Sequence, residues 1–425
     1  MLENKDKDMT PFDMREKPVR QNPFLMPVLW VGTWAMTRQF HLKIKKINMK
    51  GVKPPFLVIS THQGFSDYYI APIALYPHRA NYVSDMGGFA TFGKWLYRAG
   101  GCIGKRRYVP DVSVIRNIKH CLFNLKQSVV IFPESRHCNV GTTSLIPKNM
   151  GRLVKHLGVP LVILSVHGSY LANPFWDEER TRKSKMEATL EYVYSADDVK
   201  RLPAGTIQNV IEEKLSYDEY RYQLAEKIEI KDRGRAEGLH KPLYQCLDCG
   251  EQGCMKSKGS ILYCTECGSR WKMDEYGQLI DKHGKAVHIP DWYEWEREQV
   301  IQEIEDGRYR LDVEVQVEAL PNEKGFVKLG RGRLTHDCEK YVLQLDSGDV
   351  FESNVVGMED GTKVALCDDF PLEIHNRNLE SVQTEYNYRK KGKCIVLSTK
   401  DCCYYVYSYD PEFCVTKLQF ATEYL

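Results

Sequence analysis

Short apolar runs that alternate with helix-like segments restrict most tightly how the first 235 residues can fold. The runs cover residues 56–60, 81–84, 128–132, 160–165 and 187–194, and helical patterns occupy residues 68–75, 111–126, 149–157 and, as one long polar helix, 205–227. Strands that alternate with helices are typical of an α/β domain. The sequence therefore predicts a mostly parallel or mixed central sheet, flanked by helices, within residues 1–235.

The composition excludes several classes of protein. A chain of 425 residues with 43% hydrophobic and 27% charged side chains is ordinary for a folded protein, and its length allows about two to four domains. Lys and Arg number 59 and Asp and Glu 57, which leaves a net charge of +2. Because no strong overall field attracts polyanions, we expect no nucleic-acid partner. The charged residues 1–17 lack the apolar run of a secretory signal.

A histidine and a carboxylate follow the first predicted strand, in the segment Thr61-His-Gln-Gly-Phe-Ser-Asp67. Across a strand-to-helix turn, Asp67 can reach His62, select its tautomer and stabilise the imidazolium, which leaves the other ring nitrogen as a general base. The same pattern on its own also suits a structural turn or a helix cap.

Two further polar segments carry candidate ligand-binding residues. Phe132-Pro-Glu-Ser-Arg136 follows the strand at 128–132, which places Glu134 and Arg136 at its carboxyl end. Gly100-Gly-Cys-Ile-Gly-Lys-Arg-Arg107 sets Arg106 and Arg107 beside glycines, as suits a phosphate monoester bound by guanidinium groups. Without a ligand, the first segment would be a surface ion pair. The second would be a solvated basic face.

Together these segments resemble the motifs of the glycerolipid acyltransferase superfamily, particularly 1-acylglycerol-3-phosphate acyltransferases. The matching blocks are His62–Asp67, Gly101–Arg107, Phe132–Arg136 and 159–163, within residues 20–200. The resemblance implies transfer of a fatty acyl group from an acyl-CoA or acyl-carrier-protein thioester to lysophosphatidic acid or a related lysophospholipid. It also implies that His62 is the base, that Asp67 orients it, and that substrate is bound by Glu134, Arg106, Arg107 and Arg136.

The sequence departs from the family pattern at several positions. Ser135 replaces a glycine and is followed at once by Arg136, Gly104 and Lys105 stand at usually apolar positions, and Gly64 replaces a serine. These departures leave open which arginine binds phosphate and which lysolipid is the acceptor. The alternative to an enzyme is a lipid-binding scaffold protein without catalytic activity.

An aromatic apolar stretch at residues 24–36 precedes the catalytic motifs. Its thirteen residues span about 20 Å as a helix, short of the ~30 Å hydrocarbon core, and they place Trp30 and Trp34 on one face. Residues 38–53 add six basic side chains and no acid. This pattern predicts docking on an anionic bilayer, in a cytoplasmic protein peripheral to the inner face of the membrane. A helix buried against the sheet is the other interpretation.

Two cysteine pairs predict a metal site in a module at residues 240–290. Cys246-x2-Cys249 and Cys264-x2-Cys267 are separated by fourteen residues, and a glycine follows each pair. Four thiolates favour structural Zn²⁺ in a module that resembles a zinc ribbon, although iron takes the same ligands. Cys254 lies between the pairs and is not expected to be a ligand.

The remaining residues, 291–425, predict an acidic helix at 291–307 and a β-rich domain. Alternating patterns at 310–317, 341–345, 363–366, 393–397 and 404–409 indicate strands, with turns at Ser347-Gly348 and Asp360-Gly361. The arrangement resembles a pleckstrin-homology-like or similar β-barrel. Its sequence shows no set of residues typical of a catalytic site. The charged residues 232–241 suit a linker between the first domain and the cysteine module.

Overall fold

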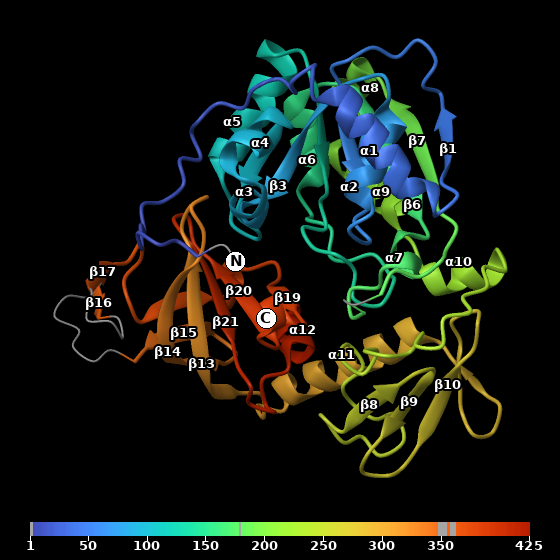
Figure 1. The fold of residues 1–425 in the computed structure, drawn as a ribbon, viewed down its shortest axis with the longest axis vertical. Coiled ribbons are helices and arrows are strands. Elements are labelled where there is room, and N and C mark those ends of the chain that lie inside the picture. The colour runs from blue at the N-terminus through green and yellow to red at the C-terminus, as the bar shows by residue number, and fades with distance from the viewer. Residues whose placement is uncertain (1–2, 178–179, 347–354, 358–362) are drawn as a thin grey trace.

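The computed structural model describes residues 3–177, 180–346, 355–357 and 363–425, which form three sheets and a small hairpin. The amino-terminal α/β domain lies above a cysteine-rich module and a β-rich domain (Figure 1). The predicted turns at Ser347-Gly348 and Asp360-Gly361 lie outside the described residues.

The amino-terminal sheet has the strand order β1-β7-β6-β2-β5-β3-β4. Strands β6, β2, β5, β3 and β4 run parallel, β7 is antiparallel to β6, and β1 is parallel to β7. The strands are β1 (Lys43–Ile47), β2 (Leu57–Ser60), β3 (Ala80–Asp85), β4 (Cys102–Lys105), β5 (Ser128–Ile131), β6 (Leu161–His167) and β7 (Glu187–Tyr194). This mixed sheet confirms the predicted α/β architecture.

Helices cover both faces of this sheet because alternate side chains of its strands are apolar on both sides. Val58 and Val162 pack with α2 (Asp67–Leu75), and α1 (Met26–Arg38) lies on α2. Leu57 and Ile163 face the opposite layer. That layer consists of α5 (Val112–Lys119) with its π-helical extension His120–Asn124, α6 (Met150–Leu157), α8 (Ala196–Arg201) and α9 (Ala204–Leu215).

Several elements of this domain depart from the sequence expectations. The unpredicted ones are the strands β1 and β4 and the short helices α3 (Met86–Phe92), α4 (Lys94–Ala99), α7 (Ser169–Ala172) and α8. The single helix expected at 205–227 is wrong, because the chain breaks into α9 and α10 (Glu219–Ala225). Ser216 is extended, and the Asp218 side chain caps α10 by accepting from the Arg221 amide (3.0 Å).

The cysteine-rich module is an antiparallel sheet of order β12-β11-β10-β9-β8. Its strands are β8 (Met255–Lys258), β9 (Ile261–Cys264), β10 (Arg270–Met273), β11 (Leu279–Ile280) and β12 (Ala286–Val287). The expectation of a linker at 232–241 is wrong. Ala236 and Leu239 are fully buried, and Gly238 has positive φ and lies against the backbone of Trp176, near which α7 (Ser169–Ala172) ends.

The β-rich domain is a seven-stranded antiparallel sheet of order β18-β15-β14-β13-β21-β20-β19. Its strands are β13 (Leu311–Leu320), β14 (Val327–His336), β15 (Lys340–Leu345), β18 (Leu372–His375), β19 (Gln383–Glu385), β20 (Cys394–Ser398) and β21 (Cys403–Tyr407), and β16 (Val355–Gly357) pairs with β17 (Lys363–Ala365). The predicted acidic helix is α11 (Ile289–Glu305), which packs on the last helix, α12 (Val415–Tyr424).

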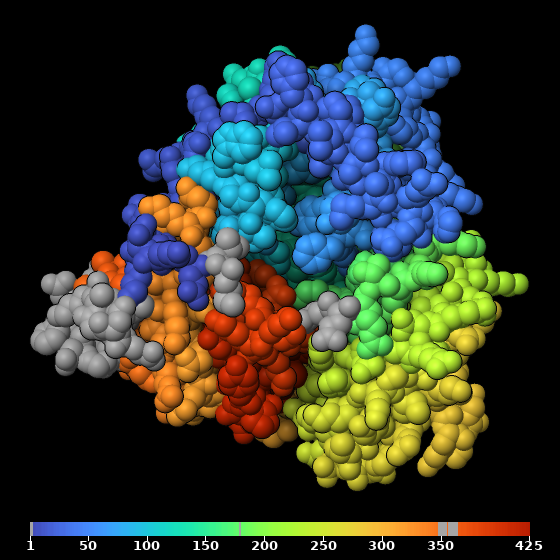
Figure 2. Space-filling view, in the orientation of Figure 1, coloured from blue at the N-terminus to red at the C-terminus, as the bar shows by residue number. Residues whose placement is uncertain are grey.

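One apolar core joins all three parts of the chain. It includes Tyr170 of the first domain, Trp271 of the cysteine module and Phe420 of α12. A second cluster packs Phe89 of α3 against Tyr405 of β21. The space-filling view shows the first domain in contact with the cysteine module and the β-rich domain (Figure 2). The carboxyl-terminal half therefore lies against the first domain.

Helix α1 presents an apolar outer face. Its inner side contacts α2, and the Trp30 ring meets Tyr76 edge-on at 4.8 Å, whereas Val28, Val31 and Trp34 are exposed. The nearby lysines belong to the edge strand β1, where Lys45 pairs with Glu187 and Lys46 donates to the Tyr76 carbonyl. No helix of the described residues is both long and apolar enough to cross a membrane.

Candidate active site

The expected motifs meet at one edge of the amino-terminal sheet. His62 follows β2, Glu134 follows the neighbouring β5, and Arg106 and Arg107 follow β4. Because these strands are parallel, their carboxyl ends lie along the same edge, where open α/β sheets place their ligands. The topology thus brings together segments that are up to 72 residues apart in the chain.

His62 is 3% exposed and lies next to Asp67, at the start of α2. Asp67 Oδ2 is 3.5 Å from His62 Nδ1 and accepts a hydrogen bond from the Gly64 amide (3.0 Å). The opposite ring nitrogen, Nε2, lies 3.4 Å from the Tyr68 hydroxyl. The sheet edge thus holds the imidazole with one nitrogen toward a carboxylate and the other toward a hydroxyl.

Burial sets the charge state of this pair. Burial and the nearby Arg107 guanidinium lower the pKa of His62 to about 3, so the imidazole is neutral at neutral pH. Burial raises the pKa of Asp67 to about 6, against the opposing effect of the Gly64 amide. At neutral pH a carboxylate therefore faces an uncharged imidazole, which is the state that a general base requires.

Glu134 connects the motifs to one another. Its Oε1 accepts from the His62 backbone amide (2.7 Å), and its Oε2 accepts from the Ser144 amide (2.8 Å) and the Tyr217 hydroxyl (3.0 Å). Burial raises the pKa of Glu134 to about 7. Its three protein donors connect this carboxyl to the His62 backbone, Ser144 and Tyr217. Its predicted contact with substrate stays a prediction.

Two of the three candidate arginines are held by the carboxyl-terminal domain. Arg106 donates to the backbone carbonyls of Lys400 (2.6 Å) and Asp401 (2.9 Å). Arg136 forms a buried ion pair with Glu423 of α12 (3.0 Å). The sequence could not anticipate these partners, since they lie almost 300 residues away. Both guanidinium groups therefore connect the first domain to the carboxyl-terminal domain, and their predicted contact with substrate stays a prediction.

Arg107 remains beside His62, and it pairs with Asp85 at the end of β3. The Asp85 side chain is 28% exposed and that of Arg107 is 19% exposed, so solvent reaches the pair. Burial acts to raise the pKa of Asp85, but Arg107 holds it below its ordinary value. Both members of the pair act electrostatically on His62 and Tyr68.

Sequence reasoning missed Asp85 and His137. The His137 ring lies 4.5 Å from that of His62, and its buried Nε2 has no partner among the described residues. Asp85 directly follows the predicted strand at 81–84, so the carboxyl-end rule that selected Glu134 also applies to it. His137 directly follows the Phe132–Arg136 motif, so the same rule applies to it.

The four predicted metal ligands converge in the cysteine module. The Sγ atoms of Cys246, Cys249, Cys264 and Cys267 all lie within 4.8 Å of one another. Cys246 is 3.7 Å from Cys267, and Cys249 is 3.8 Å from Cys264. Four sulfurs about 2.3 Å from a tetrahedral ion lie roughly 3.8 Å apart, so the arrangement fits such an ion. Cys254 donates to the Glu251 carbonyl and is outside the set.

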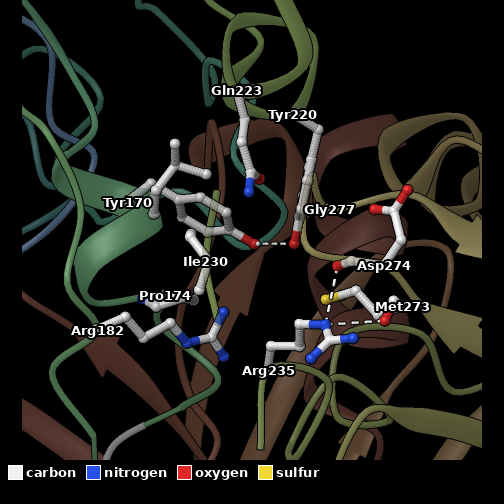
Figure 3. Close-up of a pocket in the computed structure, with 11 residues that line it drawn as sticks. Tyr170, Pro174, Arg182, Tyr220, Gln223, Ile230, Arg235, Met273, Asp274 and Gly277 are labelled. Atoms are coloured by element: carbon white, nitrogen blue, oxygen red, sulfur yellow. Dashed lines mark hydrogen bonds between the residues drawn. The ribbon is translucent and has the colours of Figure 1, made fainter. Parts of the chain in front are cut away.

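A small cavity lies where the first domain meets the cysteine module (Figure 3). The hydroxyls of Tyr170 and Tyr220 are 3.2 Å apart at one side, and Arg235 Nε donates to the carbonyls of Met273 and Asp274 (2.9 Å each) at the other. Its volume of about 10 Å³ suits one water molecule. We assign it to packing between the two parts, because an acyl chain does not fit.

Comparison with known proteins agrees with the motif geometry. Residues 41–167 match the family model described as Acyltransferase, and this range contains all four motif blocks. No curated protein matches the chain. Among solved structures, the chain is similar to the 1-acyl-sn-glycerophosphate (LPA) acyltransferase PlsC from Thermotoga maritima, with 14% identity and a TM-score of 0.36 over 45% of this chain and 79% of that one. The family match confirms the predicted resemblance.

Proposed function

Since residues 41–167 form an acyltransferase domain of the glycerolipid acyltransferase superfamily, we propose that this chain transfers a fatty acyl group from an acyl thioester to the hydroxyl of a lysophospholipid. The donor is acyl-CoA or an acyl carrier protein, and the acceptor is lysophosphatidic acid or a related lysolipid. The observation that carries the proposal is the neutral His62 held between Asp67 and the Tyr68 hydroxyl.

In this reaction His62 Nε2 takes the proton of the acceptor hydroxyl while the hydroxyl oxygen attacks the thioester carbonyl carbon. The C–S bond then breaks, and the departing thiolate takes the proton from the imidazolium. Asp67 stabilises the positive charge that His62 carries between these steps. Glu134 holds the His62 backbone, so that the ring stays aligned with the substrate.

We further propose that the domain acts while docked on an anionic bilayer. The exposed apolar face of α1 supports this, because Val28, Val31 and Trp34 are all exposed on it. Because Lys45 and Lys46 already have partners, we assign most of the attraction to apolar burial.

For the cysteine module we propose a structural Zn²⁺ bound by Cys246, Cys249, Cys264 and Cys267. The mutual sulfur distances and the positive φ of Gly250 and Gly268, one after each pair, support a pair of metal knuckles. The ion would stabilise the fold of the module and takes no part in acyl transfer.

The proposal predicts that His62→Ala lowers acyl transfer at least 100-fold, since a general base contributes about 10² to 10⁴ to the rate. Transfer of radiolabelled acyl groups from CoA and carrier-protein thioesters to a panel of lysolipids measures it. The exposed His156→Ala is the matched control and should keep the parent rate. Equal rates in His62→Ala and the parent would refute the role of His62 as the base. No transfer by the parent to any acceptor would favour a lipid-binding scaffold without catalytic activity.

A further inference from the structure

The four basic residues of the two substrate motifs each have a partner within the chain. Arg106 is bound by backbone carbonyls, and Arg136 is paired with Glu423. Lys105 donates to the Ser135 hydroxyl (3.2 Å) and is attracted by Glu380. Arg107 is paired with Asp85 and attracted by Glu385. Carboxylates therefore match Arg107 and Arg136, whereas Arg106 has only backbone carbonyl partners.

Asp85 is placed to contact a substrate as well as Arg107. It ends β3 at the catalytic edge of the sheet, and it is the more exposed member of the pair. Its Oδ1 caps α3 by accepting from the Gly88 amide (3.1 Å), while Oδ2 meets Arg107. Because the cap fixes the carboxylate in this position, Asp85 cannot move away from a ligand without loss of the helix cap.

A phosphate monoester fits this environment poorly. It carries about −1.5 to −2 charges at neutral pH and is bound in proteins by unpaired guanidinium, ammonium or amide donors. Here its phosphate would compete with Asp85 for Arg107 and be repelled by the Asp85 carboxylate. A head group without net charge avoids this repulsion, because a zwitterion or an alcohol can offer positive charge or a hydroxyl to Asp85.

From this charge arrangement we infer that the acceptor is a lysolipid whose head group has no net charge, and that Asp85 excludes the phosphate monoester. The inference rests on the proposed function and narrows its substrate class. Two acceptors share the required chemistry, a zwitterionic phosphodiester and an uncharged glycerol.

The test compares kcat/KM for four acceptors in uncharged detergent micelles, so that surface charge does not differ. Lysophosphatidylcholine and lysophosphatidylethanolamine represent the zwitterion, monoacylglycerol the uncharged alcohol, and lysophosphatidic acid the monoester. The parent should use one of the net-neutral acceptors at least tenfold better than lysophosphatidic acid. The ranking among the neutral acceptors then identifies the head group.

Asp85→Asn removes the charge but keeps a side chain that caps helices well. It should raise the ratio of kcat/KM for lysophosphatidic acid to that for the best neutral acceptor at least tenfold. Asp111→Asn is the matched control, because Asp111 caps α5 in the same way by accepting from the Ser113 amide (2.7 Å), and it should leave the ratio unchanged.

A parent that prefers lysophosphatidic acid would overturn the inference, and an unchanged ratio in Asp85→Asn would overturn the role of Asp85. If the parent transfers to no acceptor, the proposed function fails separately. Binding of glycerol 3-phosphate and glycerophosphocholine, measured by calorimetry on the parent and Asp85→Asn, then decides the charge preference. If the parent binds glycerol 3-phosphate more tightly than glycerophosphocholine, the preference for a head group without net charge is refuted.

Discussion

At the scale of single residues, burial raises the pKa of both carboxyl groups beside His62. Asp67 has a pKa of about 6 and remains ionised at neutral pH, with its Oδ2 3.5 Å from the imidazole Nδ1. Glu134 has a pKa of about 7 and accepts three hydrogen bonds from the protein. The first suits stabilisation of a transient imidazolium, and the second suits a fixed connection between β2 and β5.

Glu134 should make the chain less stable as the pH rises. The folded state keeps its proton up to about pH 7, whereas the unfolded chain releases it near 4.5, so the unfolded state binds fewer protons between these values. At about 1.4 kcal/mol per pH unit, the free energy of unfolding falls by about 3 kcal/mol over this window. Glu134→Gln cannot titrate and should lack this contribution.

Urea unfolding of the parent and Glu134→Gln at pH 5 and pH 8 measures the difference. The parent should lose stability relative to the variant between the two values, since all other titrating groups are common to both. An equal change with pH in the two proteins would contradict a raised pKa for Glu134.

At the scale of elements, α1 differs from the helices that bury their apolar side chains against the sheet. The helices α2, α5, α6 and α9 bury apolar side chains against the sheet. Helix α1 lies outside α2 and exposes Val28, Val31 and Trp34. Removal of such side chains from water contributes about 1.5–3 kcal/mol for each one buried, which is enough to hold a peripheral domain on a bilayer.

Replacement of Val28, Val31 and Trp34 by Ser should therefore lower binding to anionic vesicles at least tenfold, as measured by co-sedimentation. Serine at Val112 and Tyr409, two exposed apolar positions elsewhere, is the matched control. Charge reversal at Lys43, Lys45 and Lys46 should have the smaller effect. Equal sedimentation of the α1 variant and the parent would refute docking through α1.

At the scale of the whole molecule, the cysteine module is part of a continuous core. The rings of Trp271 in β10 and Trp292 in α11 meet at 4.8 Å, and α11 packs on α12. Glu423 of α12 then pairs with both Arg136 of the first domain and Arg297 of α11. Loss of the metal should therefore destabilise more than the module itself.

We expect about one zinc ion per chain by metal analysis. Cys249→Ser should lose the ion and lower the melting temperature of the full chain by several degrees, and a chelator should do the same to the parent. Serine at the exposed Cys338, which is outside the cluster, is the control. Less than one metal ion per chain, or a melting temperature that does not respond to its removal, would refute a structural metal.

The sequence by itself determined the features that depend on local spacing. Strands such as β2 and β5 are continuous apolar runs, the histidine and aspartate of one turn are five positions apart, and each cysteine pair forms its knuckle within four residues. Adjacent residues in the chain are adjacent in space, so these patterns could be recognised without tertiary contacts. The carboxyl-end rule also predicted that Glu134 would lie at the edge of the sheet where ligands bind.

Only the tertiary structure decided what each polar side chain meets. Arg106 and Arg136 read alike from the sequence as ligands for phosphate, yet their partners are Lys400, Asp401 and Glu423, on segments far along the chain. Asp85 reaches Arg107 because β3 and β4 are neighbours in the sheet. A charged group is neutralised by whatever folding brings within a few ångströms, and that proximity depends on the packing of distant elements, which no local pattern encodes.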